Sequence, residues 1–156
     1  MRTPNLPTRM LLNTDGSVTA LLEASFGAPV TVETLANWLD DGVLRRRAVL
    51  RLADSGRPLM RATSVLALDR LDGRARAAML SGEEPIGSVL RGAALETRRE
   101  LLPYTVDTAT ADDAAELEID EGDVIFERSY RILTSERALA DVTERIPASL
   151  FDAVAA

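Results

Sequence analysis

The segment "DVIFERSYRILTSERALADVTERIPASLF" (Asp123–Phe151) decides the fold. Apolar residues occupy alternate positions on both sides of Ser135-Glu136, and this pattern predicts a β-hairpin, because successive side chains of a strand point to opposite faces. In each arm the apolar face is interrupted by a single charged residue. These residues are Arg128 in the first arm and Glu144 in the second.

An earlier segment, Val43–Leu71, predicts a second hairpin around Asp54-Ser55-Gly56. At a constant offset of 80 residues the two hairpins share several identical residues, Thr63 and Thr143 among them (143 − 63 = 80). We interpret this similarity as two related halves of one sheet about a pseudo-twofold axis. In this alignment Ser64 corresponds to Glu144, so both are expected to face the interior.

The remaining segments predict short helices and further strands. Residues 8–27 read as two helices around a turn at Asp15-Gly16, with Gly16 expected to permit the turn, and with helices also expected within 72–82 and 83–92. Strands are expected within 28–35 and 94–106. The predicted class is α+β, a single antiparallel β-sheet with helices on one side and at the ends. Residues 1–8 are expected to form a flexible arm, and residues 9–156 a single domain.

Composition excludes several kinds of chemistry. The 156 residues contain no histidine, no cysteine and no lysine, so all 18 basic residues are arginine. A Ser-His-Asp triad, a cysteine nucleophile, a Schiff-base lysine, a zinc site with His or Cys ligands and a P-loop are therefore excluded. Carboxylates, tyrosines, hydroxyls and arginines remain. The acid-rich segment 111–123 reads as a solvated loop and short helix, with an all-carboxylate metal site as the alternative.

The charge balance bears on the partners. The formal net charge of −7 disfavours nucleic acid, whose phosphates require a basic face. The basic cluster Leu44–Arg51 is either a solvated strand face or an anion site. No apolar segment reaches the ~20 residues of a membrane span, and no secretory signal is seen, so we expect a cytoplasmic protein without a membrane partner. A monomer or a homodimer fits these observations.

Glu144 has two interpretations. It pairs with an interior arginine, either Arg128 or one of 45–47, and holds the sheet together. Alternatively, its carboxyl lines a pocket and acts as a general acid, because burial among apolar groups raises a carboxyl pKa. The alternation pattern is compatible with both interpretations.

Several segments, in this order along the chain, resemble the chorismate pyruvate-lyase (4-hydroxybenzoate synthase) family. They are "MLLNTDGSVTALLEASFGAPVTV", "RRAVLRLADSGRPLMRATSVLALDRL", "EPIG", "ETRRELLPY", "YRI" and "TERIPASLF". The resemblance implies a cofactor-free and metal-free elimination of pyruvate from chorismate that gives 4-hydroxybenzoate. The residues themselves do not firmly exclude 3-hydroxybenzoate as the product.

The resemblance also implies roles for particular residues. By motif, Glu144 is the catalytic glutamate and Arg47 the carboxylate-binding arginine, while Ile86 and Gly87 contact the product. Strand alternation instead directs Arg46 inward, and a β-bulge is needed to reconcile the two arginines. If such a bulge is present, the motif holds, so we take Arg47 as the anchor and Arg46 as the second choice. Arg128 is a further substrate-binding candidate, because it lies on the same apolar face as Tyr130. The flap, defined here as Asp15–Leu22, is expected to cover the site with Val18 at its apolar tip.

A second class of protein shares these features. The segment from 111 to 151 also resembles the effector-binding domains of GntR/HutC-type regulators, which have the lyase fold but bind small molecules without turnover. A non-catalytic small-molecule binding domain is therefore the alternative. A third interpretation is a degenerate homologue with a structural role.

Overall fold

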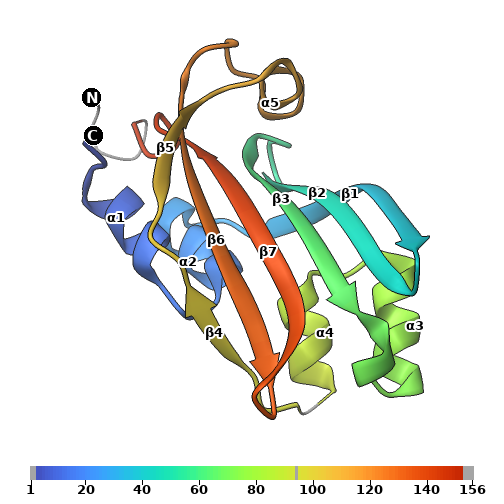
Figure 1. Cartoon of the computed structure of the whole chain (residues 1–156). Helices are drawn as coiled ribbons and strands as arrows, with labels where there is room; N and C mark the ends of the chain where they lie inside the picture. The colour runs from blue at the N-terminus through green and yellow to red at the C-terminus, as the bar shows by residue number, and fades with distance from the viewer. Residues whose placement is uncertain (1–2, 94, 153–156) are drawn as a thin grey trace.

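The computed structural model describes residues 3–93 and 95–152, and it contains one open antiparallel sheet of seven strands (Figure 1). The strand order is β1-β2-β3-β7-β6-β4, and β5 also pairs with β6. The strands are β1 (Val30–Asp40), β2 (Val43–Leu52), β3 (Pro58–Ala67), β4 (Arg98–Leu101), β5 (Thr105–Thr108), β6 (Val124–Thr134) and β7 (Arg137–Pro147).

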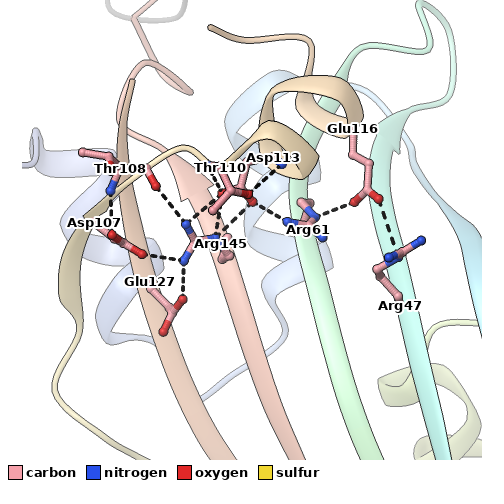
Figure 2. A network of polar contacts seen from close by, with 9 residues as sticks. All are labelled: Arg47, Arg61, Asp107, Thr108, Thr110, Asp113, Glu116, Glu127 and Arg145. Carbon is pink, nitrogen blue, oxygen red and sulfur yellow. Dashed lines mark hydrogen bonds and ion pairs between the residues drawn. The ribbon is translucent and has the colours of Figure 1, made fainter. Parts of the chain in front are cut away.

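The helices are α1 (Leu6–Asn13), α2 (Val18–Phe26), α3 (Gly73–Ser81), α4 (Ile86–Gly92) and α5 (Ala111–Leu117), with a 3-10 turn at Leu68–Arg70. Helices α1 to α4 lie on one face of the sheet, called here the inner face, and α5 covers one end of the other face (Figures 1 and 2). The predicted α+β class is thereby confirmed. Within the described part of the chain, no helix has the length and apolar character that crossing a membrane requires.

Both predicted hairpins are present, and they join at the centre of the sheet. Strands β6 and β7 turn through Ser135 and Glu136, which have φ of 49° and 59°, as a tight hairpin turn requires. Strand β3 of the first hairpin pairs with β7 of the second, and Thr63 stands directly opposite Thr143. Because these two residues are equivalent under the 80-residue offset, this register is the one that a pseudo-twofold axis between them produces.

The N-terminal helices form where the sequence predicts them, with two differences. Helix α1 begins at Leu6, so it takes in three residues of the expected arm, because the side chain of Asn5 caps it and Pro7 stands in the first turn, where no N–H is needed. Residues 1–2 of that arm lie outside the described residues. Gly16 is not in the left-handed region, so the turn between the helices does not depend on glycine, whereas Gly27 ends α2 with a φ of 63°.

The strand expected within 94–106 is interrupted. Strands β4 and β5 both pair with β6, but residues 102–104 between them belong to neither strand, although the N–H of Leu102 still donates to the carbonyl oxygen of Ser129 at 3.0 Å. Pro103 lies in this gap, and a proline has no N–H to donate to a neighbouring strand. The interruption separates the part of this edge near α4 from the part near α5.

Two apolar clusters occupy the two ends of the inner face. The first cluster contains Leu44 and Leu66 and is covered by α3 and α4, while the second contains Phe126 and Ile146 and is covered by α1 and α2. The middle of the inner face lies between them. This middle region carries the polar residues described next.

Candidate active site

Two rows of side chains cross the middle of the inner face from strand to strand. The strand register places Arg46, Ser64, Val142 and Tyr130 in one row, on β2, β3, β7 and β6. The neighbouring row consists of Ala48, Ala62, Glu144 and Arg128. Ser64 in the first row and Ala48 and Ala62 in the second have small side chains, which leave room above the sheet.

A cavity of about 90 Å³ lies above these rows. Its roof comes from α2 and α4, with Val18 at the start of α2 and Ile86 and Gly87 at the start of α4. Ser64 and Glu144 line its floor, as the hairpin alignment predicted. Val18, Ile86 and Gly87 therefore line the cavity, and Val18, which belongs to the flap, is buried.

Glu144 is the carboxylate that lines this cavity, and it is only 4% exposed. Its Oε1 accepts a hydrogen bond from Nε of Arg128 at 2.6 Å, and its Oε2 lies 3.5 Å from the hydroxyl of Tyr130. Burial raises the pKa of Glu144 above the usual glutamate value, although the guanidinium of Arg128 opposes this effect. Burial also raises the pKa of Tyr130, so its hydroxyl stays protonated and faces the carboxylate as a donor.

Arg128 is fully buried behind Glu144 and joins it to the N-terminal helices. Besides its bond to Glu144, its Nη1 donates to the carbonyl oxygens of Leu11 and Thr14, at the end of α1. Arg128 is not among the residues that line the cavity, so its predicted contact with substrate becomes, in this structure, a contact with Glu144. The two charged residues that interrupt the apolar faces of the second hairpin therefore form a buried pair.

The structure places Arg46, and not Arg47, in the cavity. Arg46 is 3% exposed, and its guanidinium donates to the carbonyl oxygens of Met79 and Glu84 at 2.6 and 2.9 Å and to Oδ1 of Asn37 at 3.2 Å. Burial lowers the pKa of Arg46. No carboxylate of the described residues pairs with it.

Arg47 points to the opposite face, where its Nε lies 3.5 Å from the carboxylate of Glu116. The β-bulge that would turn Arg47 inward is absent from β2. The pairing shifts register between Thr34 and Ala36 opposite Arg47 and again between Leu50 and Arg51, but the extra residue lies on β1 in the first case and on β3 in the second. Alternation therefore runs unbroken through Arg46 and Arg47, and the choice of Arg47 as the cavity anchor is corrected to Arg46.

Two further arginines line the cavity and were missed by sequence reasoning. Arg99 on β4 lies over the ring of Tyr130, with its Cζ 5.4 Å from the ring centroid, and Arg91 extends from α4. Alternation in "ETRRELL" permits either Arg98 or Arg99 to face inward, so the strand pattern alone could not select Arg99. In the described structure neither Arg91 nor Arg99 has a carboxylate partner.

The outer face of the sheet has the opposite arrangement, because its arginines are paired with acids (Figure 2). Asp113 of α5 is fully buried and accepts hydrogen bonds from Arg61 and Arg145. Burial alone would raise the pKa of Asp113, but the bonds from Arg145, the backbone of Thr110 and Arg61 outweigh it and hold that pKa well below its usual range. Asp113 also completes a capping box with Thr110 at the start of α5.

The acid-rich segment 111–123 thus supplies a helix cap and an ion-pair network. Within residues 3–93 and 95–152, no three His, Cys, Asp or Glu side chains are arranged so that they could hold a metal ion.

Comparison with known proteins relates this site to a family. Residues 12–153 match the family described as "Chorismate pyruvate-lyase Rv2949c-like". The chain is also 30% identical over 142 residues to the Methanocaldococcus jannaschii protein named "Putative lyase MJ0807", covering 87% of this chain and 75% of that protein.

Solved structures share the fold at low identity. The effector domain of PhnF from Mycobacterium smegmatis has a TM-score of 0.69 and 18% identity, over 85% of this chain and 88% of that one. A longer PhnF chain has a TM-score of 0.70 and 16% identity, over 86% and 65%. The "possible transcriptional regulator YydK" of Bacillus subtilis has a TM-score of 0.63 and 11% identity, over 78% and 58%. The chain therefore spans less than two thirds of the two longer proteins.

The family match covers most of the chain and agrees with the resemblance in its motifs, and the solved structures bear out the predicted kinship of fold with effector domains. The protein belongs to the chorismate pyruvate-lyase Rv2949c-like family.

Proposed function

We propose that the protein eliminates pyruvate from chorismate and releases 4-hydroxybenzoate. One observation carries the proposal. A buried carboxyl group, Glu144, lines a cavity whose other charged side chains are Arg46, Arg91 and Arg99, and none of these three has a carboxylate partner among the described residues. In a protein of net charge −7, such a cavity suits an anionic ligand that reacts with an acid.

Arg46 is the proposed anchor for the ring carboxylate. Its guanidinium is held in place by the carbonyl oxygens of Met79 and Glu84, so it loses little conformational freedom when a ligand binds. A guanidinium binds a carboxylate through parallel charge-assisted hydrogen bonds and remains charged even when buried. A bound carboxylate would also offset the cost of burying this cation.

Glu144 is the proposed general acid. The bond between the ring and the ether oxygen of the enolpyruvyl group breaks more readily when that oxygen is protonated, and neutral Glu144 would donate this proton. The ring then loses the proton of the neighbouring hydroxyl-bearing carbon and becomes aromatic, while the released enol converts to pyruvate. General acid catalysis of this kind contributes roughly 10²–10⁴-fold.

The flap keeps this chemistry away from bulk water. Val18 covers part of the cavity from above, and Arg128 connects the end of α1 to the carboxylate of Glu144. Exclusion of water strengthens the contacts of both the acid and the arginines with substrate. The buried position of Glu144 therefore suits a substrate that is itself enclosed.

A non-catalytic binding domain is the second candidate, and the pairing of Glu144 with Arg128 at 2.6 Å favours it. A neighbouring guanidinium stabilises the ionised carboxylate, which cannot donate a proton. The solved structures that share the fold include an effector domain, and such a domain would bind an anion in this cavity without changing it.

One assay separates the two candidates. Purified protein is incubated with chorismate in the presence of EDTA, and the mixture is resolved by chromatography with 3- and 4-hydroxybenzoate as standards. Equimolar pyruvate and 4-hydroxybenzoate, absent with Glu144→Gln, are expected. Chorismate that is bound but recovered unchanged supports the binding domain, and 3-hydroxybenzoate overturns the proposed product.

A further inference from the structure

Arg99 is held on two sides, yet part of its guanidinium is left without a partner. Its Nη1 donates to the carbonyl oxygens of Asp15 and Gly16 at 3.2 and 2.6 Å, and its Cζ stands over the ring of Tyr130. Its Nε is buried and has no hydrogen-bond partner among the described residues. A cation fixed in this way is prepared to receive an anion.

Arg91 approaches the same place. A Cβ atom built on Gly87 would lie 3.5 Å from Nη1 of Arg91 and 3.7 Å from Nη2 of Arg99, so both guanidiniums border the space that this glycine leaves open. The two guanidiniums carry the same charge and repel each other, and an anion bound between them would offset this repulsion. The side chain of Ser88 accepts a hydrogen bond from Arg91 at 3.3 Å and helps to hold it there.

A second cavity of about 310 Å³ meets the first at this point. Both cavities are lined by Ser17, Gly87, Arg91 and Arg99. The guanidiniums of Arg91 and Arg99 therefore stand at one end of the main cavity, where they can contact one end of a bound ligand.

The strand register separates this pair from Arg46. Arg46 and Tyr130 stand at opposite ends of a row of four strands, and neighbouring strands are about 4.8 Å apart, so their backbones lie about 14 Å apart. Arg46 extends over the floor from one end, and Arg99, which stacks on Tyr130, borders the other end. Glu144 lies between them in the adjacent row.

We propose that Arg99, assisted by Arg91, forms a second carboxylate subsite that binds the carboxylate of the enolpyruvyl leaving group. This inference rests on the proposed function and assigns the end of the site opposite Arg46. A dicarboxylate bound at both ends has its ether oxygen in the middle, next to Glu144. The subsite selects substrates with two carboxylates over ligands with one.

Equilibrium binding tests the subsite without turnover. Calorimetry compares 4-hydroxybenzoate, which has one carboxylate, with 3-(carboxymethoxy)-4-hydroxybenzoate, which has two. The parent protein should bind the dicarboxylate more than about 10-fold more tightly, because a charge-assisted hydrogen bond contributes about 1.5–3 kcal/mol. Arg99→Gln should abolish this preference, Arg99→Lys should retain part of it, and both should bind 4-hydroxybenzoate as the parent does.

Arg98→Gln is the matched control, because Arg98 is adjacent on β4 but exposed and paired with Glu136 at 2.8 Å. It should change neither affinity. Equal weakening of both ligands by Arg99→Gln and Arg99→Lys, or a parent without preference for the dicarboxylate, overturns the subsite while leaving the lyase proposal intact. A parent that binds neither ligand overturns the proposed function and the subsite together.

Discussion

Arg128 and Glu144 face each other across β6 and β7, and a hydrogen bond of 2.6 Å joins Nε of Arg128 to Oε1 of Glu144 in the interior. The same arginine holds the end of α1 through two carbonyl oxygens. One buried cation therefore connects the proposed acid to the end of α1, which leads into the flap.

The first prediction concerns Glu144. Glu144→Gln keeps an acceptor for Arg128 but no acidic proton, so it should lose most turnover and melt close to the parent. Glu144→Ala should lose turnover and also destabilise the fold by about 1–3 kcal/mol, because it leaves Nε of the buried Arg128 guanidinium without a hydrogen-bond acceptor. Product formation and thermal melting are the measurements.

Asp141→Asn is the control for this pair of variants. Asp141 lies on the same strand but is exposed, and its ion pair with Arg131 at 3.0 Å contributes little. It should leave both turnover and melting unchanged. Turnover that survives in Glu144→Gln would show that the carboxyl is not the acid.

The second prediction concerns the two neighbouring arginines. Arg46→Gln should weaken binding of 4-hydroxybenzoate by about 10- to 100-fold, because a charge-assisted hydrogen bond contributes about 1.5–3 kcal/mol. Arg47→Gln should leave the affinity unchanged, because its side chain lies on the outer face beside Glu116. Calorimetric affinities check this, and the reverse result would restore the motif-based choice of Arg47.

The third prediction concerns pH. Glu144 must be neutral to donate a proton, and burial raises its pKa. Turnover should therefore fall as pH rises through that raised pKa, with an inflection above the ordinary glutamate value of about 4.3. The stability that the neutral carboxyl contributes is complete below the ordinary value and is lost over the same rise. A pH profile of kcat checks this, and a rate that increases over this range would assign the ionised form to the reaction.

The fourth prediction concerns Asp113 on the outer face. Its pKa is lowered in the fold, so its contribution to stability is present above the ordinary aspartate value of about 3.9 and is lost as pH falls below it. Asp113→Asn should be less stable than the parent at pH 6, and the difference should shrink at pH 3. Urea unfolding at the two pH values measures this. The folded variant should keep its turnover, because Asp113 lies on the face opposite the cavity.

The fifth prediction concerns the flap turn. Gly16→Ala should melt like the parent, because Gly16 is outside the left-handed region and a Cβ there meets only Oγ1 of Thr14, at 3.4 Å. Gly27→Ala should destabilise the fold by about 1 kcal/mol or more, since Gly27 has a φ of 63°. Melting of the two variants is compared, and a large loss for Gly16→Ala alone would show that the turn does require glycine.

The sequence by itself determined the two hairpins and the side of the sheet that most residues face. Alternation with a period of two is a local property, and the turns at Asp54–Gly56 and Ser135-Glu136 begin the pairing of each hairpin. Each ladder then shifts register once, between Leu50 and Arg51 in the first and between Ile132 and Leu133 in the second. The alternation of apolar residues was therefore sufficient to predict that Glu144 and Arg128 point inward. Alternation also directed Arg46 inward, and it proved a better guide than the motif, because β2 itself has no extra residue between Val43 and Leu50 and the bulge opposite Arg47 lies on β1.

The tertiary structure alone decided which of these residues meet. The pairing of β3 with β7 and of β4 with β6 joins segments far apart in the chain, and it depends on the packing of the whole sheet rather than on any local pattern. That pairing completes the floor beneath the cavity and brings Arg99 over Tyr130. It also places α5 against the outer face, where Asp113 binds two arginines, so acids that looked solvated in the sequence became part of the buried framework.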